Sequence, residues 1–376
     1  MSRRSRWLAA AALLVLAAVA FEGRAKRKML DFEVYRTAGT RVVAGESLYR
    51  TEDGHWQFKY LPAFAFLVAP LARLPVVTAR AIWFGISIAL LVVLLNRSWR
   101  LLPDRRRTAS FVVGLTIIAL GKFYVREVGL GQGNLLLAVV VLLAVAQWRA
   151  GRNGAAGALV AAATVVKPYA IIFLPYLLGR RRFRAAGVFL LALLLAVWLP
   201  ALRYGLYGNV QLLRGWWATV TTSTAPNLIG QDNISIAGMF AVWLGVGPVA
   251  SALALATAAL LVAVCSGVLL RRAGVPFPEY LDAAVLLLLM PLLSPQGWDY
   301  VLLVSTPAVM LILDRLDEFA KPQRWLAVAC LALAGLTFWD VMGRDLFRAF
   351  MMSRIITVCA LIEVGLVLRL RTLRAA

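Results

Sequence analysis

The sequence predicts an all-α integral membrane protein, a polytopic bundle whose helices cross the bilayer many times. Two observations support this class: 62% of the 376 residues are hydrophobic, and the mean hydropathy is +0.80. A third is that apolar runs of about fifteen to twenty-three residues, the length of a bilayer span, recur from end to end. Soluble domains are about half apolar, so this excess predicts contact with lipid. No polar stretch is long enough for a separate soluble domain, and we expect residues 1–376 to form one transmembrane domain.

The first apolar segment follows three arginines and covers residues 7–21. It fits a retained first span, although the small residues at 18–20 also fit a cleavable signal peptide. A retained helix agrees with the charge pattern described next, and the sequence then predicts about twelve spans. A kink at Pro168 would instead join two of them into one broken helix. The expected spans are residues 7–21, 79–95, 109–121, 135–148, 155–167, 169–179, 185–201, 248–270, 280–293, 299–313, 325–339 and 353–369.

The formal net charge of +22 lies largely in short arginine clusters between apolar runs, at 97–107, 180–184, 271–272 and 369–374. Such clusters are typical of cytoplasmic loops, so we expect both termini inside and the longer connections outside. No basic, aromatic platform of the kind that binds nucleic acid accompanies the charge, and we expect no nucleic-acid partner. The expected outer loops are residues 22–78, which hold a juxtamembrane or re-entrant segment at 61–75, and residues 122–134, 202–247, 294–298 and 340–352.

Cysteine and histidine usage excludes several kinds of site. Cys265, Cys330 and Cys359 lie inside apolar runs without paired spacing, which is typical of packing residues rather than of disulfides or metal ligands. His55 is the only histidine. A Ser-His-Asp triad is therefore disfavoured, and a metal site built from several histidines is excluded.

Two carboxylates, Asp31 and Glu33, follow the first apolar segment by about ten residues and lie in the first outer loop. In an extended segment residues i and i+2 share a face, whereas in a helix they diverge by about 200°. Both acids serve one site only if the segment is extended. The alternative is that they are solvated loop acids balancing the basic residues at 24–28.

The second outer loop reads KFYVREVGLGQGN at 122–134. Its three glycines permit tight backbone paths, and Gln132 and Asn134 offer the neutral hydrogen bonds that sugars use. It is not a nucleotide fingerprint, because no strand precedes it. A polar loop with helix-capping glycines is an equal alternative to a ligand loop.

Other polar side chains stand out against the apolar background. Lys167 lies among apolar residues, where an ammonium costs roughly 2.5–3.5 kcal/mol at a helix centre, so it needs a snorkelling path or an anion such as a lipid phosphate. The corner SPQGWDY at 294–300 and the segment PNLIGQDNIS at 226–235 gather polar groups in short outer turns. An aromatic belt explains Trp298 but not Asp299.

Four segments together resemble the spaced landmarks of glycosyltransferase family 87, bacterial integral-membrane enzymes of the GT-C superfamily that include polyprenol-phosphate-mannose-dependent mannosyltransferases. The segments are DFEVYRTAG with VAGESLY, GQGNLLL, VVKPYAIIFLPYLLGRRRFRAA and SPQGWDY, in the family's order from residue 31 to residue 300. One departure concerns the late corner, where mannosyltransferase members carry histidine and this chain has Gln296, Trp298 and Asp299. The sugar, mannose or another pentose or hexose, therefore stays open.

The resemblance implies an inverting transfer of a sugar from a polyprenyl-phosphate donor to a glycolipid or glycan acceptor, outside a bacterial plasma membrane. It implies that Asp31 is the catalytic base, and that Lys167 and Arg126 stabilise the leaving phosphate. No cofactor is expected, since a monophosphate leaving group does not require a metal, although a weak site at Asp31 and Glu33 stays open. The expected substrate-binding residues are Glu33, Tyr35, Lys122, Arg126, Gln132, Asn134, Lys167, Gln231, Asn233, Gln296, Trp298 and Asp299.

Two other classes of function remain as alternatives. A secondary transporter or lipid flippase would favour ionisable residues at mid-membrane on broken, repeated helices, and Glu363 is the residue that fits this pattern. Glu363 also fits an interhelical partner for an arginine. A non-catalytic scaffold would not need polar residues gathered in several outer loops.

Overall fold

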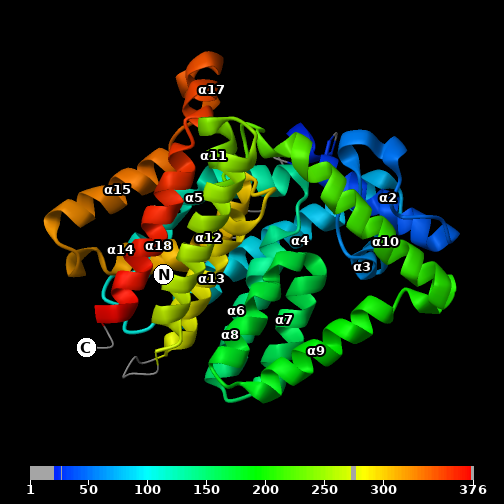
Figure 1. Cartoon of the computed structure of the whole chain (residues 1–376), viewed down its shortest axis with the longest axis horizontal. Coiled ribbons are helices and arrows are strands. Elements are labelled where there is room, and N and C mark those ends of the chain that lie inside the picture. Colours follow the sequence, from blue (N-terminus) through cyan, green and yellow to red (C-terminus); the bar gives the residue numbers. More distant parts are fainter. Residues whose placement is uncertain (1–20, 27, 272–276, 374–376) are drawn as a thin grey trace, which may run out of the picture.

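The computed structural model describes residues 21–26, 28–271 and 277–373, and these residues form helices joined by short turns (Figure 1). The prediction of an all-α chain is confirmed for this part of the sequence. The expected span at 7–21 lies outside the described residues except for its last position.

The α-helices are α2 (Leu30–Ala44), α3 (Pro62–Ala72), α4 (Val76–Leu101), α5 (Ala109–Leu130), α6 (Asn134–Arg149), α7 (Asn153–Val166), α8 (Phe173–Gly179), α9 (Phe183–Trp198), α10 (Ala201–Leu228), α11 (Ile236–Leu244), α12 (Pro248–Leu269), α13 (Pro278–Leu293), α14 (Thr306–Asp314), α15 (Lys321–Gly335), α16 (Trp339–Met342), α17 (Arg344–Met352) and α18 (Ile355–Leu373).

Five short segments of other helical geometry connect them. They are η1 (Phe21–Ala25), η2 (Thr51–Trp56), η3 (Pro168–Ile172), η4 (Asp299–Ser305) and η5 (Leu316–Glu318). The first is a π-helix and the other four are 3₁₀-helices. Two of these segments, η3 and η4, form the beginnings of the expected spans 169–179 and 299–313, and both lie next to the site described below.

Among the residues that the structure describes, three helices, α4, α5 and α12, are long and apolar enough to cross a membrane. Two bent pairs, α9 with α10 at 91° and α17 with α18 at 49°, raise the number to five if each pair is one span. The structure therefore supports a multi-pass membrane protein with three to five candidate spans, and the expected number of about twelve is not shown. Several expected spans form apolar helices that are only 10–17 residues long, among them α6 and α7.

The chain breaks at Lys167, between α7 and η3. Lys167 has an extended backbone (φ −142°, ψ 111°), and η3 then leads into α8. Pro168 explains the break, because proline lacks an N–H donor and disfavours the helical conformation of the preceding residue. The two expected spans on either side of Pro168 are therefore separate helical segments.

Three expected outer loops contain long helical stretches instead. Helix α5 extends to Leu130, so most of the expected loop 122–134 is helical, and the turn between α5 and α6 is only residues 131–133. The expected loop 202–247 forms α10 and α11, and the expected loop 340–352 forms α16 and α17. The charged residues at this end of α5, Lys122, Arg126 and Glu127, are tolerated in a helix, because each has a polar partner outside α5.

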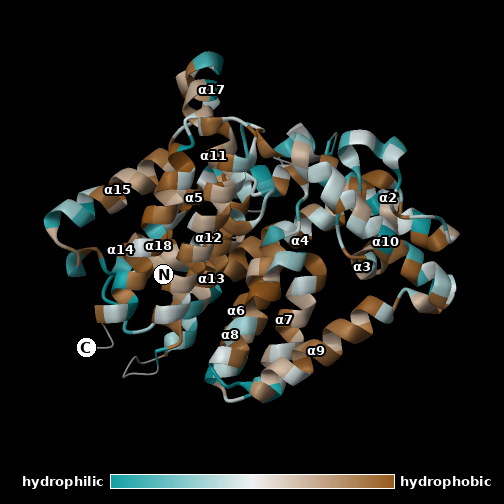
Figure 2. Ribbon diagram, in the orientation of Figure 1, coloured by the Kyte–Doolittle hydropathy of each residue, from teal (hydrophilic) through white to brown (hydrophobic). Residues whose placement is uncertain are grey.

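Helix α13 is packed among other helices, beside α12 and α18 in the view of Figure 1. Residues 280–292 are all buried, and α13 contacts α6, α11, α12, α14 and α18. The outer helices differ from it, since α9 is hydrophobic along most of its length (Figure 2) and yet carries Leu190, Leu191, Leu194 and Leu195 with exposed fractions of 50–64%. Apolar side chains exposed in this number are expected where a helix faces lipid.

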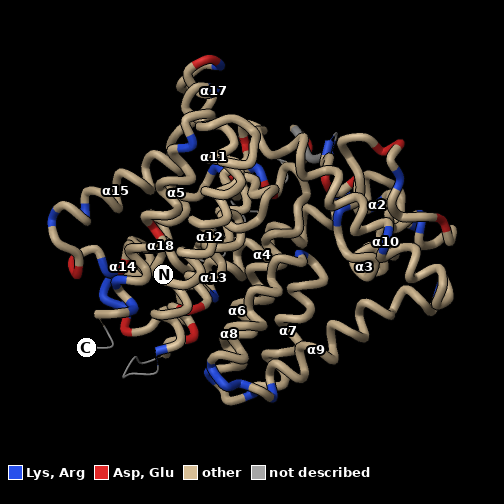
Figure 3. The backbone as a smooth tube through the Cα atoms, in the orientation of Figure 1, with Lys and Arg blue, Asp and Glu red and all other residues tan. Residues whose placement is uncertain are grey.

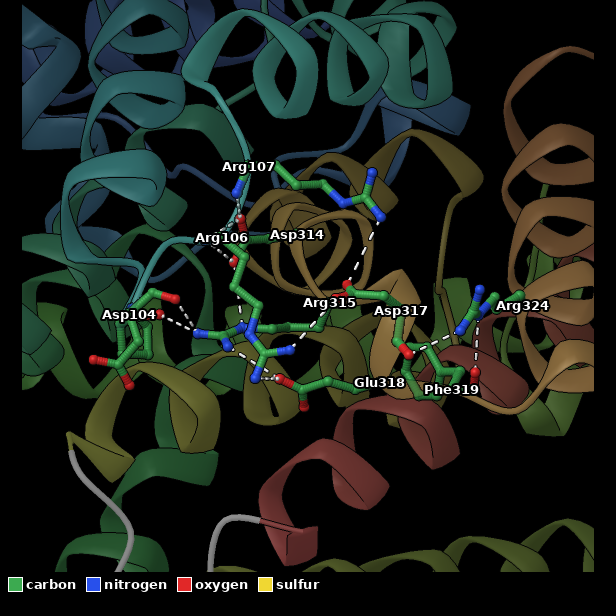
Figure 4. Close-up of polar contacts among 10 residues, drawn as sticks. Asp104, Arg106, Arg107, Asp314, Arg315, Asp317, Glu318, Phe319 and Arg324 are labelled. Carbon is green, nitrogen blue, oxygen red and sulfur yellow. Dashed lines mark hydrogen bonds and ion pairs between the residues drawn. The ribbon is translucent and has the colours of Figure 1, made fainter.

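Arginine-rich turns gather at one end of the bundle, below α8 and beside α14 in Figure 3. Hydrogen bonds tie these turns together: Arg149 donates to the Leu101 carbonyl (2.8 Å), and Arg180 to the Arg271 carbonyl (3.3 Å). The Asp314 carboxylate accepts the backbone N–H groups of Arg106 (3.0 Å) and Arg107 (2.9 Å), as Figure 4 shows. We call this the basic end. Its turns are residues 101–108, 149–153, 180–182, 271 and 314–318.

Candidate active site

A cavity of about 400 Å³ opens at the other end of α5 and α6, away from the basic end. Seven parts of the chain form its wall: the start of α2, the segment 55–60, the end of α5 with the turn that follows it, the break at Lys167, the middle of α10, Asp232 between α10 and α11, and the corner 294–301. Its lining includes the polar or charged side chains of Asp31, Lys59, Gln132 and Lys167. The cavity therefore gathers segments that are far apart in the sequence.

A hydrogen-bond network joins the wall around Gln132. The Gln132 Oε1 atom accepts from Tyr35 OH (2.9 Å), Tyr60 OH (3.1 Å) and Lys167 Nζ (3.2 Å). Its Nε2 atom donates to Tyr300 OH (3.2 Å), and the Tyr35 and Tyr60 hydroxyls are 2.6 Å apart. Lys167 Nζ also donates to Tyr60 OH (2.9 Å). This network fixes the Lys167 ammonium at the cavity wall instead of letting it snorkel away.

Asp31 lies in the first turn of α2 and points into the same cavity. Burial raises the pKa of its carboxyl above the usual value of 3.8, and Gln132 and the positive charge of Lys167 partly offset this effect. Because the segment is a helix, Glu33 faces elsewhere: it pairs with Arg36 (3.0 Å) and Arg80 (2.7 Å) and does not line the cavity. The two acids therefore do not share one site, and a metal site formed by both is not present in this geometry.

Arg126, in the last turns of α5, is held by two carboxylates from later parts of the chain. Its Nη1 atom lies 2.6 Å from Asp299 Oδ1, and its Nη2 atom lies 2.5 Å from Asp232 Oδ2. The guanidinium also stands over the Tyr300 ring at 5.3 Å from the centroid. Arg126 borders the cavity as expected, but its positive charge is already compensated.

Lys59 contributes a second ammonium to the wall, from the segment before α3. Its Nζ atom donates to Gln296 Oε1 (3.4 Å), and Gln296 Nε2 donates in turn to Ser223 Oγ and Thr224 Oγ1 of α10 (both 3.1 Å). Burial lowers the pKa of the Lys59 ammonium below its usual value of 10.5, and the nearby Asp31 opposes this change. Together these bonds connect the late corner to α10 and to the lysine.

The sequence of residues 58–295, more than half of the chain, matches the profile of glycosyltransferase family 87. The chain belongs to glycosyltransferase family 87. The resemblance noted from the four sequence landmarks is confirmed, and the protein is a transferase that needs a sugar donor and an acceptor. Comparisons with curated proteins and with solved structures gave no match.

In this family 87 transferase, seven of the residues expected from the sequence line the cavity. They are Asp31, Tyr35, Arg126, Gln132, Lys167, Gln296 and Trp298. The expectation that Lys167 and Arg126 approach one pocket therefore agrees with the geometry, although the paired state of Arg126 does not favour it as an anion ligand.

The other expected residues of the transferase lie behind the wall or away from it. Asp299 pairs with Arg126, and Asn134 Nδ2 donates to the buried Glu127 (2.8 Å). Asn233 Nδ2 donates to the Pro295 carbonyl (2.8 Å) and so braces the late corner. The others are Glu33, Lys122, whose Nζ atom donates to Thr337 Oγ1 (2.9 Å), and Gln231, whose carbonyl accepts from Arg354 (3.0 Å).

Several cavity residues were not expected from the sequence. Lys59 and Tyr60 directly precede the segment 61–75, and a lysine beside an expected re-entrant segment was a usable signal. Two further tyrosines line the cavity. Tyr169 follows Pro168, where the sequence predicts a possible kink, and Tyr300 follows Asp299, which an aromatic belt does not explain. The remaining unexpected lining residues include His55, Trp56, Trp216 and Asp232.

Metal ligands do not gather in the described part of the transferase. No three His, Cys, Asp or Glu side chains among residues 21–26, 28–271 and 277–373 lie close enough to hold an ion.

Proposed function

We propose that this family 87 transferase moves a sugar from a polyprenyl-phosphate donor to a glycolipid or glycan acceptor on the extracytoplasmic side of the membrane. The observation that carries the proposal is that Asp31 and Lys167, a base and a cation, share one cavity at the end of the helices. A lipid-linked sugar keeps its tail in hydrocarbon and its reacting bond at the headgroup level. A base that acts on the acceptor must therefore stand at the end of the helices, as Asp31 does.

In the proposed reaction Asp31 removes the proton from the acceptor hydroxyl as that oxygen attacks the anomeric carbon. The new bond joins the acceptor oxygen to the sugar, and the bond between the anomeric carbon and the phosphate oxygen breaks with inversion. The electron pair of the broken bond stays on the phosphate, which gains negative charge. A lysine fixed at the wall stabilises this charge without reorganisation during the reaction.

An apolar groove beside the cavity supports a lipid-linked donor. It has a volume of about 500 Å³ and is formed by α3, α6, α7 and α9. Val166 belongs to its lining, and the next residue, Lys167, belongs to the cavity wall. A donor with its phosphate at Lys167 would thus have apolar surface available for its hydrocarbon chain.

The donor class is tested by incubating the purified full-length protein with radiolabelled sugars on polyprenyl phosphate and with membrane glycolipids as acceptors. We expect transfer of label to the acceptor and release of polyprenyl phosphate. Labelled nucleotide sugars serve as the comparison, since they carry the same sugars on a soluble leaving group. Transfer from nucleotide sugars, with none from the lipid-linked donors, would rule out the proposed donor.

We expect the transfer rate to fall as pH decreases, with an apparent pKa above 3.8. The reason is that burial raises the pKa of Asp31, and only the carboxylate form accepts a proton. The rate is therefore retained above this pKa and lost as pH falls through it. The acid limb of a pH profile of kcat/KM, in which the rate falls with decreasing pH, measures this apparent pKa. A value at or below 3.8 would contradict the assignment of Asp31 as the base.

The proposed orientation places the basic end in the cytoplasm and the cavity outside, in agreement with the positive-inside rule. Ser47→Cys and Thr222→Cys should be labelled by an impermeant maleimide in intact cells, and Arg105→Cys should not. All three positions are exposed, and Cys265, Cys330 and Cys359 are buried, so the native background is low. Labelling of the Arg105→Cys protein alone would invert the orientation.

A further inference from the structure

Two lysine ammoniums on the cavity wall make their hydrogen bonds, within the described part of the chain, to neutral oxygens. Lys167 Nζ donates to Tyr60 OH and Gln132 Oε1, and Lys59 Nζ donates to Gln296 Oε1. The arginine of the same wall is bound differently, since Arg126 holds two carboxylates. The lysines therefore keep their charges available to a ligand in the cavity.

The position of the two ammoniums is unfavourable without an anion. Both are partly buried and line the same cavity, and Lys167 Nζ donates to the hydroxyl of Tyr60, the residue that follows Lys59. Their like charges oppose each other. Asp31 attracts both of them across the cavity. Glu127 also attracts Lys167 from behind the wall, but its carboxylate is occupied by the backbone N–H groups of Asn134 (2.6 Å) and Leu135 (3.0 Å). Two like charges held near one cavity are stabilised by a ligand that carries more than one negative charge.

We propose that Lys59 and Lys167 together form the binding site for a phosphate monoester dianion, the leaving group of the transfer reaction. This inference rests on the proposed function. The donor is a phosphodiester with a single negative charge. When the bond to the anomeric carbon breaks, the electron pair stays on the phosphate oxygen, and the product is a monoester with two charges. The second lysine therefore acts mainly on the transition state and the product, which is how a binding group raises turnover.

Gln296 is the positioning residue of this site. Its Nε2 atom donates to the Ser223 and Thr224 hydroxyls, so its Oε1 atom is turned toward Lys59. Arg126 borders the same cavity, but both of its terminal nitrogens are engaged by carboxylates. Lys59 is thus the cation that complements Lys167.

The inference is tested by binding to the full-length protein in nanodiscs, with three ligands and four proteins. The ligands are inorganic phosphate, farnesyl phosphate as a monoester, and methyl farnesyl phosphate as a diester of the same chain length. The proteins are the wild type, Lys59→Gln, Lys59→Arg and Lys321→Gln. The last variant removes one positive charge at the start of α15, beside Arg107 and Asp317 of the basic end and outside the cavity lining, and controls for net charge.

For Lys59→Gln we expect the dissociation constant of the monoester to rise about tenfold, the scale of one charge-assisted hydrogen bond, and that of the diester to rise less than about threefold. Lys59→Arg should stay close to the wild type, because it keeps the charge, and Lys321→Gln should match the wild type. A merely structural role for Lys59 would weaken both ligands equally. Equal weakening, or no change in either, would overturn the inference.

Two further comparisons complete the test. The first identifies the source of the phosphate, and the second distinguishes failure of the two-lysine site from failure of the proposed function. Farnesyl phosphate binding at least about tenfold more tightly than inorganic phosphate would support a lipid headgroup, while equal binding would overturn the lipid assignment. If the monoester binds in a Lys59-dependent way but the wild type transfers no sugar from lipid-linked donors, the two-lysine site stands and the proposed function fails. If transfer occurs and binding does not depend on Lys59, the function stands and the site fails.

Discussion

Replacement of Asp31 by asparagine is expected to lower turnover by about 10²- to 10⁴-fold, the usual contribution of a general base, while donor binding survives. Asparagine keeps the shape of aspartate and can occupy the same place in the first turn of α2, but its amide does not accept the proton of the acceptor hydroxyl. The measurement is kcat with a polyprenyl-phosphate sugar, together with donor affinity. Because Asp31 lies on the cavity wall and not in the hydrophobic core, we expect normal expression and an unchanged melting temperature.

Glu33→Gln is the matched control for Asp31→Asn. Glu33 lies two residues further along the same helix, but its carboxylate pairs with Arg36 and Arg80 outside the cavity. We expect this change to affect stability slightly and turnover little, because these ion pairs are partly exposed. Wild-type rates from a normally expressed Asp31→Asn protein would remove the base assignment. Severe loss from both variants would indicate a role shared by the two acids, which the helical geometry opposes.

Replacement of Lys167 by alanine is expected to weaken donor use by roughly 1.5–3 kcal/mol, which is about a 10- to 150-fold loss in kcat/KM. The ammonium is fixed at the cavity wall by Tyr60 and Gln132 and would bind the donor phosphate. Its positive charge also stabilises the Asp31 carboxylate, so its removal should raise the pKa of Asp31 further. The acid limb of the pH profile should therefore move to higher pH in the Lys167→Ala protein.

Tyr60→Phe separates the charge of Lys167 from the network that holds it. This variant removes one hydrogen bond to the ammonium and leaves the positive charge in the cavity. We expect a smaller loss in kcat/KM than in Lys167→Ala, and no upward shift of the acid limb. If the well-folded Lys167→Ala protein has unchanged donor affinity, turnover and pH profile, the lysine serves only to anchor the segment.

Local sequence pattern was sufficient for parts of the fold. Helix α12 coincides with the expected span 248–270 to within one residue, because a continuous apolar run without charges permits few other conformations in lipid. The break at Pro168 also followed from local chemistry. The number of spans did not, since length and hydropathy cannot tell a short buried helix such as α6 from a helix that crosses the bilayer.

The site was less predictable, because its partners are distant in the sequence. Residues 122–134 were expected to form a polar loop, but most of them are helical, and Arg126 is held by Asp232 and Asp299, which follow it by 106 and 173 residues. No local pattern indicates such pairs. Likewise, whether Asp31 and Glu33 share a face depended on the choice between helix and extended chain, and the apolar contacts of Phe32 and Tyr35 in the core favour the helix.

Gly131 leaves no room between the start of α2 and the turn that carries Gln132. It has a left-handed backbone (φ +73°), and a Cβ atom there would lie 2.7 Å from the Cβ atom of Phe32. Its carbonyl accepts from the indole of Trp83 (2.8 Å), so the turn is held from the opposite side as well. The separation between Asp31 and Gln132 is consequently set by the close contact of Gly131 with Phe32. Any side chain larger than hydrogen at position 131 would push the turn away from α2, and would carry Gln132 away from Asp31 with it.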